Sequence, residues 1–306
     1  MYQIWKLRSL IADWNDFVLT HYPIVKETPY LAEKIGDHSM KKLKEQICTE
    51  LIQFVEEEEK ERNQKRWKQP LIEFADAYHP YVRRLKEIVH SEHQMPEEVL
   101  KDAKTVLVYF LPFCDWVAKS NEEEGLASSE WARIYEETNA FFLKINQHMI
   151  KYIEGLGYQA RMAPEASVFY RDEVISHWSF RHLAYAAGLG TFGMNNMLIT
   201  EYGCAGRLNA LVTNLPVETG SPQKEEACLY KRNGSCGLCI KRCPSQALTD
   251  KKFDRHKCFA QCLKNAEVHT QFGNSYADQA GEEAVDSGSE VCGKCLVHLP
   301  CTSRRP

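Results

Sequence analysis

The sequence has no long apolar run, no excess of positive charge and no secretory leader at its start. No apolar stretch approaches the roughly 18 residues of a membrane span, so we expect none. A formal net charge of −4 lacks the basic excess of nucleic-acid-binding proteins, so a nucleic acid is not an expected partner. The opening MYQIWKLRSLIADW has neither an apolar signal core nor a small-residue cleavage site, which predicts a cytoplasmic protein.

Cysteine, by contrast, is abundant and unevenly placed. Nine of the 12 cysteines follow Gly220. In a reducing compartment they are not expected to form disulfides, and metal or cluster ligation is favoured. This distribution predicts three parts: a mainly helical region that packs on the core (1–103), an α/β cofactor-binding core (104–220) and a ferredoxin-like module with two clusters (221–306).

The hydrophobic pattern predicts an α/β (α+β) fold, with a mixed sheet covered by helices. The apolar run 105–113 has the composition of a buried strand, and the segments 166–170, 196–200 and 208–214 are further strand candidates. Apolar residues recur at helical spacing from Met40 to Phe54 and from Trp131 to Ile153. Ser128 and Gly155 mark the two ends of the second helix. The polar, glycine-containing segment 274–290 is expected to be an exposed excursion.

The cysteine spacing is typical of iron–sulfur proteins. The run Cys236-x2-Cys239-x3-Cys243-Pro244 matches the second half of the bacterial ferredoxin motif, in which the cysteine before proline binds the other cluster. Two 4Fe–4S clusters need eight thiolates. By this crossed pattern we assign one cluster to Cys228, Cys236, Cys239 and Cys301, and the other to Cys243, Cys258, Cys292 and Cys295.

Two alternatives remain open for these cysteines. A pair of zinc sites would also use C-x2-C pairs, although the spacing C-x2-C-x3-C-P favours a cluster. Cys262 could replace Cys258 as a ligand, since spacing alone separates them, and we take Cys262 as a buried spare. Cys48, Cys114 and Cys204 are expected to be packing residues.

The block 182–218, which contains AGLGTFGMN, resembles the superfamily of epoxyqueuosine reductases and reductive dehalogenases, together with 102–113 and the cysteine module. The chain looks like a divergent, short member, and the likeness covers about residues 96–301. The resemblance implies two 4Fe–4S clusters and cobalamin. It places the corrinoid against Gly188, Gly190, Gly193, Asn195, Leu198 and Ile199. Glycines without a Cβ allow close backbone approach to a planar cofactor, although a helix C-cap would also explain Gly190.

The proton donor implied by the resemblance is altered in this chain. Epoxyqueuosine reductases carry an aspartate three residues before a proline, and the matching RMAP places Arg161 there. Dehalogenases use a tyrosine beside a cation. We therefore predict Tyr170 as the acid, with Arg161 or Arg171 lowering its pKa. The alternative is that Tyr170 is a core aromatic residue with a satisfied hydroxyl.

Two functions follow. The first is a cobalamin-dependent iron–sulfur reductase that acts on a small organic molecule and takes electrons from a donor such as ferredoxin or flavodoxin. The second is an electron-transfer or corrinoid-handling protein that reduces a partner's cobalamin without substrate chemistry of its own. The glycine block favours the first, and the missing aspartate favours the second.

Overall fold

The computed structural model describes residues 29–306, with side chains from residue 39 onward. Contacts divide the chain into two units, Met1–Ile47 and Cys48–Pro306, and only the second is discussed below. The helix α3 (Pro29–Glu59) runs across this boundary. The first 28 residues of the predicted N-terminal region lie outside the described residues. No helix in the described range is both long enough and apolar enough to cross a membrane.

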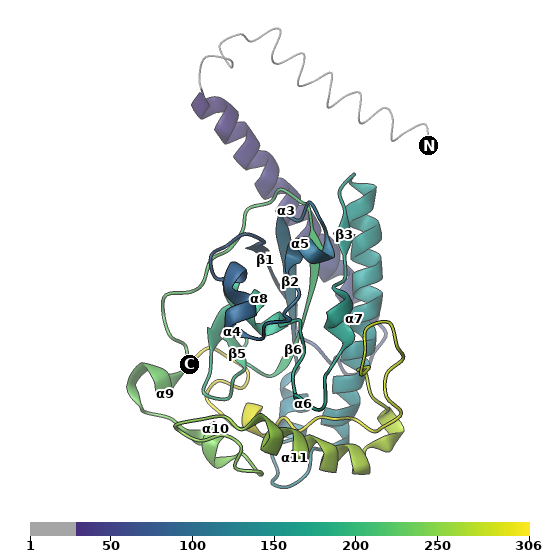
Figure 1. The fold of residues 1–306 in the computed structure, drawn as a ribbon, viewed down its shortest axis with the longest axis vertical. Coiled ribbons are helices and arrows are strands. Elements are labelled where there is room, and N and C mark those ends of the chain that lie inside the picture. Colours follow the sequence, from purple (N-terminus) through teal and green to yellow (C-terminus); the bar gives the residue numbers. More distant parts are fainter. Residues whose placement is uncertain (1–28) are drawn as a thin grey trace. The chain divides into compact units, whose positions relative to one another are not determined.

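A four-stranded sheet with the order β1-β2-β6-β3 forms the centre of the second unit (Figure 1). Its strands are β1 (Leu71–Asp76), β2 (Thr105–Pro112), β3 (Ala160–Arg161) and β6 (Gly206–Thr213). All eight residues of β2 are buried, as its β-branched and aromatic run predicts. The predicted fold class, a helix-covered sheet, is confirmed. All three strand pairs are antiparallel, so the sheet is purely antiparallel and not mixed as the sequence predicted.

The two faces of the sheet pack against different helices, because successive side chains of a strand point to opposite sides. Val106, Val108 and Phe110 of β2 belong to the core cluster that includes Leu183 of α8 (Phe180–Ala186). On the other face, the Tyr109 hydroxyl donates to Asn146 Oδ1 of α7 at 2.7 Å.

The long helix α7 (Ser129–Gly155) confirms the second predicted helix. The Ser128 hydroxyl accepts a hydrogen bond from the Trp131 backbone N–H at 3.1 Å, which caps its first turn.

Shorter elements connect these layers. They are η1 (Val82–Arg84), α4 (Leu85–Ile88), α5 (Pro96–Val99), α6 (Asp115–Ser120), η2 (Pro164–Ser167) and the hairpin of β4 (Gly190–Phe192) with β5 (Leu198–Thr200). The cysteine-rich third contains α9 (Leu229–Asn233), α10 (Leu238–Lys241), α11 (Arg255–Val268), η3 (Thr270–Phe272) and η4 (Lys294–Leu296).

Two strands differ from the expectation based on sequence. The strand predicted at 166–170 is wrong, since Pro164 begins a 3-10 turn there and only isolated bridges form at Val168 and Tyr170. Conversely, β1 was not predicted, although it pairs with β2 along six residues. It lies in the region that the sequence assigned to helices. The three-part division of the chain stays a prediction.

Two histidines that contact Ser179, the residue before α8, should make stability depend on pH. Burial lowers the pKa of His93 and of His182 to about 4, and each ring hydrogen-bonds Ser179. His93 Nε2 accepts the Ser179 backbone N–H at 3.0 Å, which requires an unprotonated nitrogen. Because the folded-state pKa lies below the unfolded value, this contribution is complete above about pH 6.5 and is lost as the pH falls towards 4.

We expect the free energy of unfolding to fall by about 1 kcal/mol per histidine between about pH 7 and about pH 5.5. Urea unfolding at the two pH values measures this, and His93→Gln should remove about half of the difference. An unchanged pH dependence in that variant would show that His93 is not one of the groups responsible.

Candidate functional site

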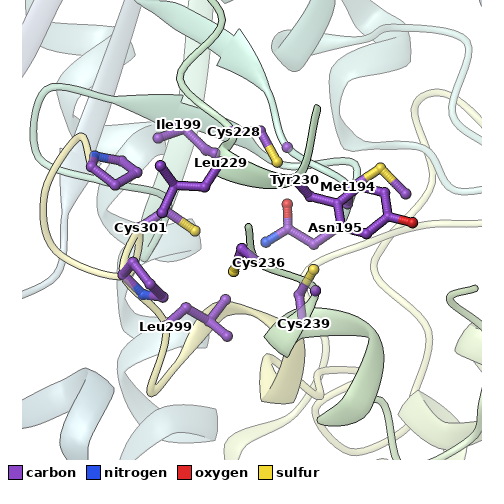
Figure 2. A pocket seen from close by; sticks show the side chains of 14 residues that line it. Met194, Asn195, Ile199, Cys228, Leu229, Tyr230, Cys236, Cys239, Leu299 and Cys301 are labelled. Atoms are coloured by element: carbon purple, nitrogen blue, oxygen red, sulfur yellow. The ribbon is translucent and has the colours of Figure 1, made fainter. Parts of the chain in front are cut away.

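Four cysteines line one small, partly open pocket in the C-terminal third. They are Cys228, Cys236, Cys239 and Cys301, the four that the spacing assigns to one cluster. In Figure 2 the sulfurs of Cys228, Cys239 and Cys301 point into the space between them. The pKa of Cys239 is raised to about 12, mainly by burial and then by Cys301, Cys228 and Cys236, in that order. A thiol with such a high pKa stays protonated at neutral pH unless a metal centre binds the sulfur and displaces the proton.

The other predicted set also comes together. Burial raises the pKa of Cys295 well above its usual value, and Cys292, Cys258 and Cys243 add to the shift. The pKa of Cys292 is raised to about 11 by burial, with Cys258 and Cys243 again contributing. The assignment of these eight cysteines as ligands stays a prediction, but each predicted set forms one group in space.

Cys258 and Cys262 are one turn apart on α11 and interact directly. A hydrogen bond from the Cys262 thiol lowers the pKa of Cys258, whereas the same pairing raises the pKa of Cys262. The thiolate of the pair is therefore favoured on Cys258. Cys262 also lies near Cys292 and Cys295, so the choice between the two ligands remains open.

The spacing of the sulfurs bears on the zinc alternative. In a tetrahedral zinc site with Zn–S bonds of about 2.3 Å, neighbouring sulfurs are about 3.8 Å apart. Among the residues that the structure describes, which include all 12 cysteines, no three thiol sulfurs lie within 4.8 Å of one another. Neither group therefore has the compact spacing of a preformed tetrahedral zinc site.

The glycine block is explained by contacts within the chain. A Cβ on Gly188 would overlap the carbonyl oxygen of Ser221, and one on Gly190 would overlap that of Ile199. Gly188 also has a φ of +82°, which glycine adopts without strain. These two glycines are therefore required by the fold itself and give no separate support for a corrinoid. Leu198 lies in β5 and is buried.

The second half of the block faces the cysteines. Gly193, Asn195 and Ile199 line the cavity of the first set (Figure 2). Asn195 Nδ2 donates to the carbonyl oxygen of Cys295 at 2.9 Å, so this side chain connects the two cysteine groups.

Cys204 lies beside the first set. It is buried, as predicted, and its backbone N–H donates to the Cys301 carbonyl oxygen at 2.9 Å. A hydrogen bond from its thiol also lowers the pKa of Cys301. This contact was not predicted, because 97 positions separate the two cysteines and spacing gives no sign of it.

Known proteins are similar to this chain in sequence. No protein-family model matches the sequence. Epoxyqueuosine reductase of Lactococcus garvieae is 28% identical over 198 residues, which cover 62% of this chain and 51% of the relative. The Listeria monocytogenes enzyme is 29% identical over 120 residues, which cover 39% and 28%. The chain thus spans at most about half of these curated relatives.

Solved structures agree on the fold. The epoxyqueuosine reductase of Bacillus subtilis matches with a TM-score of 0.51 and 19% identity, over 84% of this chain and 65% of that one. An epoxyqueuosine reductase bound to an epoxyqueuosine-modified tRNA stem loop gives a TM-score of 0.52 with the same identity and coverage. The chain is therefore similar in sequence and in fold to the epoxyqueuosine reductases.

Among these relatives one is bound to RNA, which weakens our expectation that a nucleic acid is not a partner. That expectation used only the net charge of the whole chain.

The predicted acid of this epoxyqueuosine reductase homologue is not beside a cation. The Tyr170 hydroxyl donates to Glu165 Oε2 at 2.9 Å, and its pKa is raised, first by burial and then by Glu165. Arg161 pairs with Glu154 at 2.9 Å, and Arg171 pairs with Glu290 at 3.0 Å. The predicted pairing of Tyr170 with either arginine is therefore wrong, because acidic neighbours hold all three side chains. A catalytic role for Tyr170 and Arg161 stays a prediction.

A different tyrosine has the expected cationic partner. Arg207 of β6 donates to the Tyr276 hydroxyl oxygen, and its guanidinium lies 4.1 Å from the centre of the Tyr135 ring. Arg207 is held in place by two hydrogen bonds to Asn139 Oδ1 at 3.0 and 3.2 Å. A tyrosine oxygen that accepts a charged hydrogen bond is stabilised after its proton leaves. This group was not predicted, because Tyr276 lies in the segment we took for an exposed excursion.

Proposed function

We propose that the protein is a cytoplasmic reductase that holds two 4Fe–4S clusters in its C-terminal third and also binds a corrinoid. The observation that carries the proposal is the pocket lined by Cys228, Cys236, Cys239 and Cys301, since the distant Cys301 joins three closely spaced cysteines, as the crossed ligand pattern predicts. When bound, the clusters would supply one-electron transfer. An external donor such as ferredoxin or flavodoxin would deliver the electrons.

The chain's own residues would stabilise the charged centres. The Lys294 ammonium lies between the positions of Cys292 and Cys295 in sequence and is almost fully buried. It donates to the carbonyl oxygens of Asn121 and Glu123 at 3.2 and 2.6 Å. Its positive charge favours ionised Cys292. We expect it to offset part of the negative charge of the second cluster.

The corrinoid rests on the superfamily alone. Gly188 and Gly190 are accounted for by chain packing, and Gly193, Asn195 and Ile199 face the first group of cysteines. We therefore derive no catalytic step through a corrinoid. Its binding residues stay a proposal, to be decided by cobalt analysis.

The composition of the purified protein tests the proposal. After anaerobic purification with cobalamin in the medium, we expect about eight irons, a similar amount of sulfide and one cobalt per chain. Iron without cobalt, even after reconstitution, would reject the corrinoid and leave the alternative of an electron-transfer protein. Zinc in place of iron would reject the clusters as well.

Substrate class is tested in the same preparation. The first substrate to assay is the epoxyqueuosine-modified stem loop, because a relative binds it. Small epoxides are assayed alongside the stem loop, because they represent the small organic substrates that the sequence predicts. Reduction of a partner corrinoid protein without turnover of either class would favour the electron-transfer alternative.

Replacing Tyr276 by phenylalanine should slow turnover of whichever substrate is reduced by about 100- to 10,000-fold, the usual contribution of a general acid. Arg207 donates a hydrogen bond to the Tyr276 oxygen, and Tyr276 does not line the cysteine pocket, so the effect should appear in kcat rather than in iron content. Tyr170→Phe is the matched comparison. A large loss for Tyr170→Phe and none for Tyr276→Phe would restore the prediction from sequence and reject the role of Tyr276.

A further inference from the structure

A group of metal-binding side chains lies apart from the cysteines. His90, Glu173 and His177 each offer one ligand atom, and these atoms all lie within 4.8 Å of one another. His90 Nε2 and Glu173 Oε2 are already 3.0 Å apart. In the described part of the chain, no other group of three histidine, cysteine or carboxylate ligands meets this spacing.

His177 has a nitrogen that the fold leaves unsatisfied. The residue is only 8% exposed, and its Nε2 is buried without a hydrogen-bond partner. Its ring lies between Tyr170, with centroids 4.0 Å apart, and His90, with centroids 4.7 Å apart. A buried polar atom without a partner costs free energy, and aromatic packing does not recover it. A ligand bound at His177 Nε2 would recover this free energy.

The backbone holds the three side chains in two neighbouring loops. The Gln94 N–H donates to the His177 carbonyl oxygen at 2.9 Å, which joins the loop after α4 to the loop before α8. Tyr170 and Ile175 exchange two backbone hydrogen bonds and close a tight turn that carries Glu173. Val174 in this turn has a φ of +53°, a strained value for a β-branched residue. Strain of this kind is found at sites where a side chain must be held in place.

We propose that His90, Glu173 and His177 form a binding site for a divalent transition-metal ion, with zinc as the best match, that joins these two loops. Two imidazoles and one carboxylate are a common protein ligand set for zinc, with bonds of about 2.0–2.2 Å. The site contains no cysteine, and the proposal does not rest on the clusters.

Binding requires one ring to turn and the same ring to change tautomer. The His90 and His177 rings are within 7° of parallel, and an ion in the plane of both needs a rotated ring. His90 is the one that can turn, because its side chain is partly exposed. The Glu92 N–H donates to His90 Nδ1 at 3.3 Å, which places the His90 proton on Nε2. Zinc at Nε2 therefore requires the neutral ring to move its proton to Nδ1, which ends the hydrogen bond from the Glu92 N–H.

Zinc binding to the cluster-loaded protein tests the site. Cysteines already bound to iron do not compete, and a chromophoric chelator reports free zinc. We expect one zinc per chain in the unaltered protein. Loss of a direct ligand in Glu173→Gln or His90→Gln should weaken binding by about 100-fold or more, since even indirect partners of a metal contribute 10- to 100-fold. Both side chains are at the surface, so these variants should fold.

His148→Gln is the matched control. His148 Nε2 lies 2.6 Å from Glu50 Oε1, a histidine–carboxylate pair without a second histidine. Zinc binding should be unchanged in this variant. Equal affinity in Glu173→Gln, His90→Gln and the unaltered protein would overturn the proposal. So would the absence of zinc binding at micromolar concentrations when the iron content is complete.

Discussion

Replacing Cys239 by serine should lower the iron content from about eight to about four atoms per chain. Cys239 is buried beside Cys228, Cys236 and Cys301, so its loss opens the first cavity while the second group keeps all its thiols. A serine hydroxyl ionises far less readily than a thiol and is a poor iron ligand. Iron and sulfide analysis of anaerobically purified protein measures the change.

Cys114→Ser is the control for this substitution. Cys114 precedes α6 and does not line the cavity, and it should keep the full iron content. Loss of all iron in Cys239→Ser would mean that the two centres assemble only together. Full retention of iron would contradict the assignment of Cys239 as a ligand.

Replacing Gly203 by alanine should destabilise the loop that carries Cys301. Gly203 has a φ of +80°, and a Cβ there would lie 2.6 Å from both the Cys301 carbonyl oxygen and the Arg304 nitrogen and would overlap Thr302. The left-handed conformation costs alanine roughly 1–2 kcal/mol. Forcing backbone apart adds about 1–3 kcal/mol. We expect this variant to unfold at lower urea and to lose iron from the first cluster.

Gly125→Ala separates the conformational cost of alanine from the cost of steric overlap. Gly125 has a φ of +91°, but a Cβ at this position would meet nothing within 4 Å, so alanine there carries the conformational cost without the overlap. Its urea midpoint should fall less than that of Gly203→Ala, and its iron content should be unchanged. Equal effects of the two substitutions would show that contact with the Cys301 loop is unimportant.

The sequence was informative where one local pattern dictates the structure. The apolar run of β2 and the capped, periodic α7 were predicted because burial and hydrogen bonding act within each segment. The two cysteine groups were predicted because ligand spacing reflects the geometry of a shared centre. By contrast, β1 carries a glutamate and an aspartate within six residues, and only its pairing with β2 makes it a strand.

Contacts between distant segments were not visible in the sequence. Tyr276 meets Arg207 across 69 positions, and His90 meets His177 across two loops. No periodicity or spacing relates such residues. In the glycine block the sequence suggested a function that the structure does not need. Gly188 and Gly190 were predicted to contact a cofactor, but backbone packing within the chain already explains why both are glycine.

The crossed arrangement of the cysteines has a consequence for how the protein is made. Cys228, Cys236 and Cys239 leave the ribosome first, but their partner Cys301 is translated after every cysteine of the second group. On the predicted ligand sets, three thiols of one centre are therefore synthesised before any ligand of the other centre, and their fourth partner comes last. Thiols that await a metal are open to oxidation, so we expect the iron content of the product to depend on reducing conditions during synthesis.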